Sequence, residues 1–391
     1  MLDNKEINKI KKKCPSIGKL SIGKPSQEFI KQVFSQFSKI RPLLKQKWVN
    51  LEIKWQKINY QSIKSSLKNE LPNKIKSAIE NKIKYCVEYQ ISIGDKKIVF
   101  HIYSIKKEKN EIVRKKIILM CLWLTYILSL IKNQCSSLLN IYLFFLPNKK
   151  SLPYFDHQYL DTENVNTAFT FCCKPNNEIV IFRDEEWFKV FIHETFHSFG
   201  VDFAPYSQGI NGKMEEMFGI KINYDLTESW CETWARLFNI IIISYFENNN
   251  FNQYEGFRKS FNKRFTDEVI YSILQMQKII IFYKLDLKSI LQGKQTNPYQ
   301  EGTPVFSYFV LTSLNLLNIN EFIIWCNENN KPIFNFGYDT IKLEKYVVFL
   351  KKIVVISLTN PDLDCIAIHS KSKTKKNKSL RMTINEINIK N

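Results

Sequence analysis

The sequence predicts an α+β protein, and three observations point to this class. Alternating apolar and polar residues on both sides of Gly94-Asp95 predict a β-hairpin. Short β-rich segments follow up to residue 183, and long helical patterns dominate the rest of the chain. Apolar residues make up 45% of the 391 residues, enough for a sizeable core. Strands gathered in one part and helices in another are typical of the α+β class.

The first 84 residues are basic and largely helical in pattern. Residues 1–25 contain two prolines and two glycines and are interpreted as a flexible arm. Residues 26–84 are expected to form helical pieces that break near Pro42 and Pro72. The two strands of the hairpin are then predicted at Tyr85–Ile93 and Lys97–Ile105.

The most apolar run is Ile117–Ile131, fifteen residues with lysines on both sides. A membrane-spanning helix needs about 20 apolar residues, so a buried helix is favoured and no transmembrane span is expected. Strands are predicted at Leu139–Phe145, Thr167–Cys173 and Glu178–Arg183. The next helix is predicted to run from an N-cap at Asp184 to Phe199, with Gly200 as its stop.

Helices dominate beyond residue 200. They are predicted at Leu226–Phe246 and Arg258–Tyr283, and an apolar stretch follows at Val305–Leu317. The lysine- and serine-rich run from Ser370 to Lys378 is interpreted as a solvated tail. The predicted organisation is a basic arm and helical region (1–84), a strand-containing subdomain (85–200), a helical subdomain (201–369) and a basic tail (370–391).

The net charge of +20 is unevenly distributed. Residues 1–150 carry 21 more Lys and Arg than Asp and Glu, whereas residues 151–250 carry nine more acidic than basic residues. A basic surface suits nucleic acid, but no nucleic-acid-binding motif accompanies the charge. A Lys-, Asn- and Ile-rich coding bias is therefore the favoured explanation. Nucleic acid stays an unsupported possibility as a partner, and the acidic centre is where the chemical motif lies.

The nine cysteines are scattered, and none forms a CxxC pair. The N-terminal residues are polar and lack the apolar stretch of a secretory signal. These features predict an intracellular, cytoplasmic protein in a reducing environment. The cysteines are accordingly interpreted as small buried apolar residues and not as a disulfide framework.

The segment His193-Glu-Thr-Phe-His197 carries the chemistry. Because the two histidines are four residues apart on a predicted helix, their imidazoles lie on one face and can share a Zn²⁺ ion. Glu194 projects beside them and can act as the general base for a zinc-bound water. The surrounding apolar residues and the strand immediately before the helix favour a metal site over chance occurrence.

A zinc ion needs a third protein ligand. The metzincin pattern requires a histidine where this chain has Phe203, and Asp202 is one residue out of register, so that pattern fails. The helix that follows offers Glu228 and Glu232, two carboxylates one turn apart on an otherwise apolar helix, where they are costly unless paired or metal-bound. Glu228 is predicted to be the third ligand and Glu232 an outer-shell acceptor for a ligand histidine, with the reverse assignment open.

This combination resembles the gluzincin branch of the zincin metallopeptidases. The order of hairpin, apolar helix, strands and HExxH helix also resembles a zincin, so the predicted fold is zincin-like: a small mixed sheet with an edge strand and a mainly helical C-terminal subdomain. Thr167, Ala168 and Phe169 are similar to the edge strand that pairs with an extended substrate in zincins. The composition and the phrase HETFHSFGVDF are similar to uncharacterised metallopeptidase-like proteins of large DNA viruses.

The resemblance implies a zinc-dependent metallopeptidase acting on a protein or peptide. Gluzincins supply a further Tyr or His to the transition state, and no motif identifies that residue here. Tyr206, Tyr224 and Tyr308 are candidates. A different class of function is a catalytically silent structural or interaction protein, of the virion or host-binding, whose working part is the basic N-terminal region. The intact pair of histidines with Glu194 favours the enzyme. The sequence gives no signal for oligomeric state.

Overall fold

The structure is a computed structural model that describes residues 2–20, 22–48, 51–59, 63, 69–153, 159–204, 209–248, 253–296, 298–337, 339–370 and 377–389. The chain divides into two compact units, each assembled from separate stretches of sequence. Unit 1 contains residues 1–30, 150–165 and 201–385, and unit 2 contains residues 31–149, 166–200 and 386–391. The sequence, in contrast, suggested four contiguous segments.

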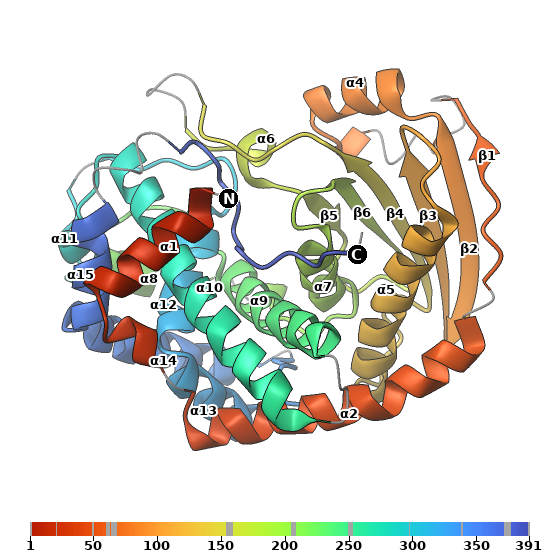
Figure 1. Cartoon of the computed structure of the whole chain (residues 1–391). Coiled ribbons are helices and arrows are strands. Elements are labelled where there is room, and N and C mark those ends of the chain that lie inside the picture. Colours follow the sequence, from red (N-terminus) through yellow and green to blue (C-terminus); the bar gives the residue numbers. More distant parts are fainter. Residues whose placement is uncertain are drawn as a thin grey trace. The chain divides into compact units, whose positions relative to one another are not determined.

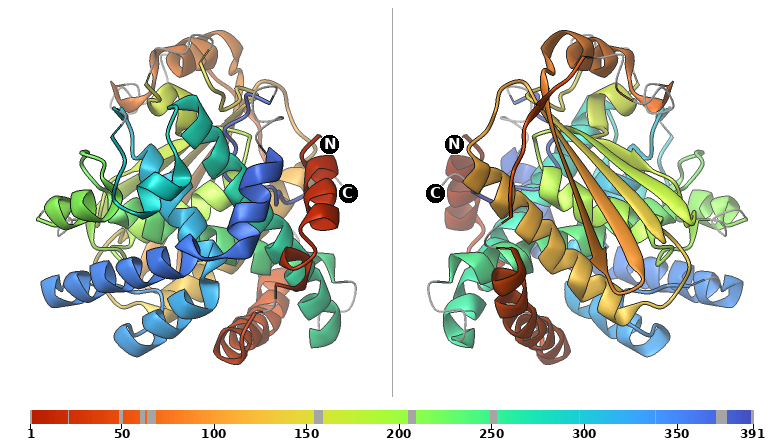
Figure 2. Two further views of the ribbon diagram at one scale, coloured as in Figure 1. Left: turned by 90° about the vertical axis from the view of Figure 1, so that its left-hand side faces the viewer. Right: turned by 90° about the vertical axis from the view of Figure 1, so that its right-hand side faces the viewer.

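Unit 2 is built on a six-stranded mixed sheet, whose strands are seen side by side in Figures 1 and 2. The strands are β1 (Gln56–Lys57), β2 (Tyr85–Ile93), β3 (Lys96–Ser104), β4 (Leu138–Leu146), β5 (Ala168–Thr170) and β6 (Asn176–Arg183). Their order is β1-β2-β3-β4-β6-β5. Neighbours β3, β4 and β6 are parallel, and the other pairs are antiparallel. The protein is therefore of mixed α/β class, and the predicted hairpin is confirmed.

The helices of unit 2 are most of α2 (Lys24–Trp48), α4 (Asn73–Lys82), α5 (Asn110–Leu130) and α7 (Trp187–Ser198). Helix α4 buries Ile75 and Ile79 in a cluster with alternate residues of the sheet, among them Phe144 and Phe182. Helix α5 is the predicted apolar helix, and residues such as Met120 and Trp123 are fully buried in it. Its burial confirms the prediction of a core helix.

Among the described residues, no single helix combines the length and apolar character that a membrane crossing requires. One pair of helices, Phe306–Leu317 and Ile319–Asn329, passes such a test jointly but is bent by 91°.

Three predicted boundaries in unit 2 were wrong. Helix α2 runs through Pro42 without a break. Helix α7 begins at Trp187 and not at Asp184, because strand β6 runs to Arg183 and the Asp184 N–H still donates to Leu146 O of β4. Strand β5 is shorter than predicted, because the chain turns at Cys173, whose φ is +40°.

Unit 1 is helical. Its elements are α1 (Leu2–Lys13), η1 (Ile17–Lys19), the start of α2, α6 (Thr162–Val165), α8 (Asn211–Phe218), α9 (Leu226–Glu247), α10 (Tyr254–Phe282), α11 (Leu287–Leu291), η4 (Phe306–Leu311), α12 (Thr312–Leu317), α13 (Ile319–Asn329), α14 (Thr340–Leu358) and α15 (Pro361–Ser370). Helix α9 is buried almost all round, as expected of a central core helix. It contacts α10, η4 and α12. The helices predicted at Leu226–Phe246 and Arg258–Tyr283 are confirmed as α9 and α10.

Both ends of the chain are more ordered than the sequence suggested. Residues 2–13 form α1 and not a flexible arm, because Ile7 and Ile10 are buried and α1 contacts α10 and α15. Most of the predicted solvated run lies outside the described residues. Beyond it, Leu380 and Thr383 are fully buried, so this part of the predicted tail belongs to the core of unit 1.

The cysteine prediction was wrong for four of the nine residues. Cys14 is bonded to Cys365 in unit 1, and Cys135 is bonded to Cys173 in unit 2. The pairs are 351 and 38 residues apart in sequence, so no local spacing marks them. The other five cysteines form no disulfide, and all but Cys172 are buried as predicted: Cys86, Cys121, Cys172, Cys231 and Cys326.

Candidate metal centre

His193 and His197 lie one turn apart on α7, in unit 2. Their Nε2 atoms are 3.1 Å apart and their ring centroids 4.9 Å apart, so the two imidazoles present the same nitrogen to one point. His193 and the adjacent Glu194 are buried, with 6% and 7% of their surface exposed, and His197 is half-buried. The predicted helical stacking of the two imidazoles is therefore present.

The spacing of the two nitrogens fits a shared metal ion. Two nitrogens bound at 2.0–2.1 Å to one tetrahedral zinc ion lie about 3.3–3.4 Å apart, close to the 3.1 Å found here. A single proton shared between two neutral imidazoles gives a similar spacing. The donor set, two neutral nitrogens beside a carboxylate, is one that zinc accepts without rearrangement of the helix.

Two backbone N–H groups and one hydroxyl group fix the end of α7 that carries His197. The His197 carbonyl accepts the N–H of Cys173 at 3.2 Å and that of Gly200 at 3.0 Å. The next carbonyl, of Ser198, accepts the Ser136 hydroxyl at 2.7 Å. These bonds satisfy carbonyls that a helix end otherwise leaves without partners. His197 thus sits on a fixed last turn and not on a frayed one.

The opposite face of α7 is held by α5. Trp123 Nε1 donates to Thr195 Oγ1 at 2.8 Å, and the rings of Trp123 and Phe196 stack with centroids 6.0 Å apart. Thr195 and Phe196, the two residues between Glu194 and His197, are fully buried. The motif therefore divides cleanly: its middle residues anchor the helix to the core, and its outer residues form the histidine pair.

Gly200 ends the last turn in a conformation that a side chain would strain. Its φ is +60°, and an added Cβ would lie 3.0 Å from Cys173 Cβ and 3.1 Å from Cys135 Sγ of the disulfide. The predicted glycine stop is confirmed, and it places the disulfide directly against the end of the HExxH helix.

Gly200→Ala is expected to destabilise the protein by about 2–4 kcal/mol, from the left-handed backbone and from crowding against the disulfide. Gly94→Ala is the matched control, since Gly94 has a φ of +59° with nothing within 4 Å of the added Cβ. That variant should lose only about 1–2 kcal/mol. Equal losses in chemical denaturation would show that the disulfide does not crowd the helix end.

The predicted edge strand lies beside this helix. Strand β5 forms one edge of the sheet, is antiparallel to β6, and contacts α7 (Figure 1). Ala168 and Phe169 belong to β5, and Thr167 precedes it with its carbonyl accepting the Phe182 N–H at 3.0 Å. An edge strand can add an extended peptide through backbone hydrogen bonds.

Glu228 and Glu232 lie on α9, in unit 1, so the structure defines the two halves of the predicted site separately. Glu228 is in the first turn, where its N–H donates to the N-cap side chain of Asp225 at 3.3 Å. Glu232 is 1% exposed and accepts Arg236 Nε at 2.8 Å. Arg236 also donates to Ser272 Oγ at 2.9 Å.

The tyrosine candidates gain no support as catalytic donors. Tyr224 is fully buried and its hydroxyl donates to Ile220 O at 2.6 Å, while desolvation raises the pKa of its phenol. Tyr308 is buried in an apolar cluster of unit 1. Tyr206 lies outside the described residues.

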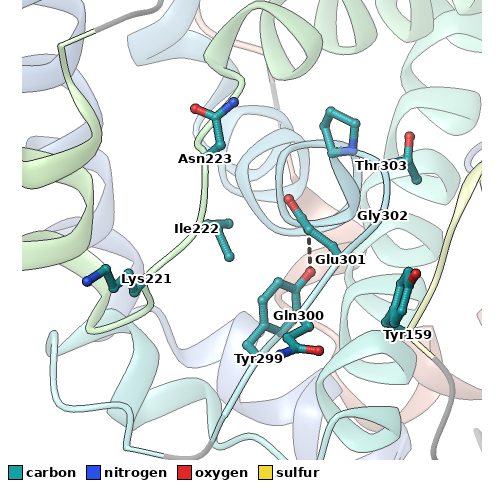
Figure 3. Close-up of a pocket in the computed structure, with 10 residues that line it drawn as sticks. Tyr159, Lys221, Ile222, Asn223, Tyr299, Gln300, Glu301, Gly302 and Thr303 are labelled. Carbon is teal, nitrogen blue, oxygen red and sulfur yellow. Dashed lines mark hydrogen bonds between the residues drawn. The ribbon is translucent and has the colours of Figure 1, made fainter.

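Unit 1 also contains a pocket that the sequence did not indicate, with a volume of about 490 Å³. It lies between the chain segments 221–223 and 299–304, with Tyr159 at one side (Figure 3). Glu301 is its acidic group, and one carboxylate oxygen accepts Tyr299 Oη at 2.6 Å and Phe306 N at 2.8 Å. In the sequence, the one available sign of this pocket is Glu301, an acidic residue shortly before the predicted apolar stretch Val305–Leu317.

Desolvation raises the pKa of Glu301 to about 7, against the lowering effect of the hydrogen bonds from Tyr299 and the backbone. The folded protein therefore binds this proton more tightly than the unfolded chain, so the contribution of Glu301 to stability falls as pH rises from about 4.5 to about 7. Glu301→Gln should remove this loss. Relative to wild type, the variant should gain up to about 3 kcal/mol between pH 4.5 and pH 8, measured by urea denaturation. A pH-independent difference would refute the assignment.

Unit 2 thus presents a mixed sheet with a histidine pair on the helix beside its edge strand, and unit 1 is a helical body with a carboxylate-bearing central helix. No protein-family model and no solved structure matches the chain. It is 25% identical over 198 residues to "Uncharacterized protein R210" of Acanthamoeba polyphaga mimivirus, which is 48% of this chain and 49% of that protein. The chain is therefore similar to a viral protein and spans about half of its length.

Proposed function

We propose that this protein is a zinc-dependent peptide hydrolase of zincin-like design. The observation that carries the proposal is the pair of Nε2 atoms, of His193 and His197, 3.1 Å apart on one face of a helix whose C-terminal end is fixed. Glu194 directly follows the first histidine, in the position that HExxH enzymes use for a general base. A helix that served only as scaffold would need neither the paired imidazoles nor a buried carboxylate beside them.

Glu194 has the central chemical role in this proposal. Zinc held by the two histidines would supply a Lewis acid that acidifies a water and polarises the substrate carbonyl. Glu194 takes a proton from the attacking water as the new C–O bond forms, and gives it to the leaving nitrogen as the C–N bond breaks.

We propose Glu228 as the third zinc ligand. Glu232 is already engaged by Arg236 inside α9, whereas Glu228 is only half-buried, in the first turn of the same helix. A carboxylate bound to Arg236 would have to exchange an ion pair at 2.8 Å for the metal.

The substrate would be an extended peptide or an extended segment of a protein. Among the described residues, strand β5 is the last strand at one side of the sheet, and it contacts the HExxH helix. Pairing with backbone groups confers little sequence preference, so we expect cleavage of several unrelated peptides.

The test is zinc binding together with hydrolysis, measured on the disulfide-bonded protein. We expect about one zinc per chain and zinc-dependent cleavage of unstructured peptides. His197→Ala should abolish both, whereas His101→Ala, which removes a histidine on strand β3, should leave both intact. Wild-type protein with no bound zinc after metal repletion would reject the enzyme and favour a structural or interaction role.

A further inference from the structure

Three zinc-binding groups gather in unit 1, independently of the His193–His197 pair. Cys14, Cys365 and His369 each offer a ligand atom, and these atoms lie within 4.8 Å of one another. Cys365 and His369 are four residues apart on α15, which places them on one face of that helix. Cys14 directly follows α1, so the cluster joins the first helix of the chain to α15.

In the structure the two sulfurs are bonded to each other. The Cα atoms of Cys14 and Cys365 are 6.0 Å apart, and Cys365 Sγ is 3.6 Å from Lys13 O. Reduction by an external thiol or phosphine delivers two electrons and two protons, which break the S–S bond and leave two thiols while the reductant is oxidised. Helices α1 and α15 would then lose their covalent link, but the thiols would remain near His369.

We propose that the reduced chain binds zinc at this point, through Cys14, Cys365 and His369. Two thiolates and one imidazole are ligands that zinc prefers, and they leave the fourth tetrahedral position to a water molecule. Zinc displaces the two thiol protons to solvent, so no oxidant is needed in this step. The link between α1 and α15 thus exists in two forms, a disulfide in oxidising surroundings and a zinc–thiolate bridge in reducing ones.

The surroundings favour a cation. Helix α1 ends at Lys13 and α15 at Ser370, so Cys14 and His369 lie at helix C-termini, and Cys365 lies one turn before His369. Carbonyls at helix C-termini carry partial negative charge, which stabilises a nearby cation. Cys14 is fully buried and the other two groups are half-buried, a degree of enclosure that suits a structural ion.

The basic residues of α1 are the opposing influence. Lys13 Nζ lies 3.3 Å from His369 Nδ1, so binding through that nitrogen requires the exposed lysine side chain to turn away. Lys11 is paired with Asp267 at 2.6 Å, which offsets its charge. Lys13→Ala should therefore tighten zinc binding in the reduced state.

The second disulfide provides an internal comparison. Cys135 and Cys173 are joined against Gly200, and no histidine or carboxylate forms a metal-sized group with that pair among the described residues. Reduction of Cys135–Cys173 is therefore not expected to create a zinc site. A gain of zinc on reduction reports on Cys14 and Cys365.

The experiment compares oxidised protein with protein reduced by a phosphine, using the full chain and zinc alone as probe. Reduced wild type should bind one zinc per chain more than oxidised wild type. With Co²⁺ in place of zinc it should show a thiolate-to-metal charge-transfer band, which a site of histidines and a glutamate does not give. His369→Ala should weaken binding at least about 10-fold, and Cys172→Ser, which alters a half-buried cysteine outside both disulfides, should not change zinc binding.

The outcome separates this site from the proposed hydrolase site. A chain carrying His193→Ala and His197→Ala should still gain the zinc and the charge-transfer band on reduction, whatever becomes of hydrolysis. Equal zinc content in the oxidised and reduced states, or a cobalt spectrum without the thiolate band, would overturn the proposal. Should Cys14→Ser fail to fold, the His369→Ala titration and the wild-type cobalt spectrum decide the matter on their own.

Discussion

Glu194→Gln is expected to abolish peptide hydrolysis while the protein keeps its zinc. Glutamine has almost the same shape as glutamate but cannot take a proton from water, and the loss of a general base typically lowers the rate by about 10²–10⁴-fold. The metal should stay, since the proposed ligands are His193, His197 and Glu228. Hydrolysis of a fluorogenic peptide and zinc content of the same preparation are the two measurements.

The matched control is Glu185→Gln in the same unit. Glu185 is also buried, 3% exposed, and is paired with Lys149 at 3.5 Å, outside the HExxH motif. It tests whether neutralising a buried glutamate of unit 2 is enough to lower activity. If Glu194→Gln cleaves peptides at the wild-type rate, the base is another group. If Glu185→Gln is as inactive as Glu194→Gln, the effect is structural.

Local sequence patterns correctly predicted those helices and strands whose buried face follows from the spacing of apolar residues in a short segment. The hairpin around Gly94, the buried helix α5 and the central helix α9 all show a clear period or an unbroken apolar run. The histidine pair was predictable for the same reason, because His193 and His197 need only one helical turn to meet. Their glycine stop at residue 200 was likewise readable from the sequence.

Features that depend on distant partners were not predictable. Helix α1 is highly polar, and its order comes from burial of Ile7 and Ile10 and from contact with α10 and α15. Residues 383–385 are held by Glu268, whose carboxylate accepts the Thr383 hydroxyl at 2.7 Å. The two disulfides and the pocket around Glu301 also join segments that no short-range pattern connects.

The partner of Glu232 on α9 was likewise not predictable from the sequence. The sequence indicated that two glutamates on an apolar helix need compensation, but it did not show that Arg236 compensates Glu232 at 2.8 Å while lying 3.9 Å from Glu268. All three side chains are about 1% exposed or less. A buried group of two carboxylates and one guanidinium is sensitive to removal of any member, because the remaining charges stay buried.

The two glutamates of α9 are therefore expected to fail in different ways. Glu232→Ala should lower the free energy of unfolding by about 3–5 kcal/mol, since it leaves the Arg236 guanidinium buried without its closest partner. Glu228→Ala should cost less than about 1 kcal/mol, because its side chain is half-buried and its N–H keeps the Asp225 cap. The zinc affinity of the Glu228→Ala variant, however, should fall by more than the roughly 10–100-fold loss that is typical when an outer-shell residue is mutated.

Because Glu232→Ala can lose zinc simply by unfolding, a second variant keeps the comparison sharp. Glu232→Gln combined with Arg236→Met removes both charges at similar volume, and such replacement of a buried ion pair is often neutral or stabilising. The double variant should melt close to wild type and bind zinc normally if Glu228 is the ligand. Suppose instead that Glu228→Ala binds zinc normally while the folded double variant binds it weakly. The roles of Glu228 and Glu232 would then be exchanged, because between two folded variants only loss of the true ligand weakens zinc binding.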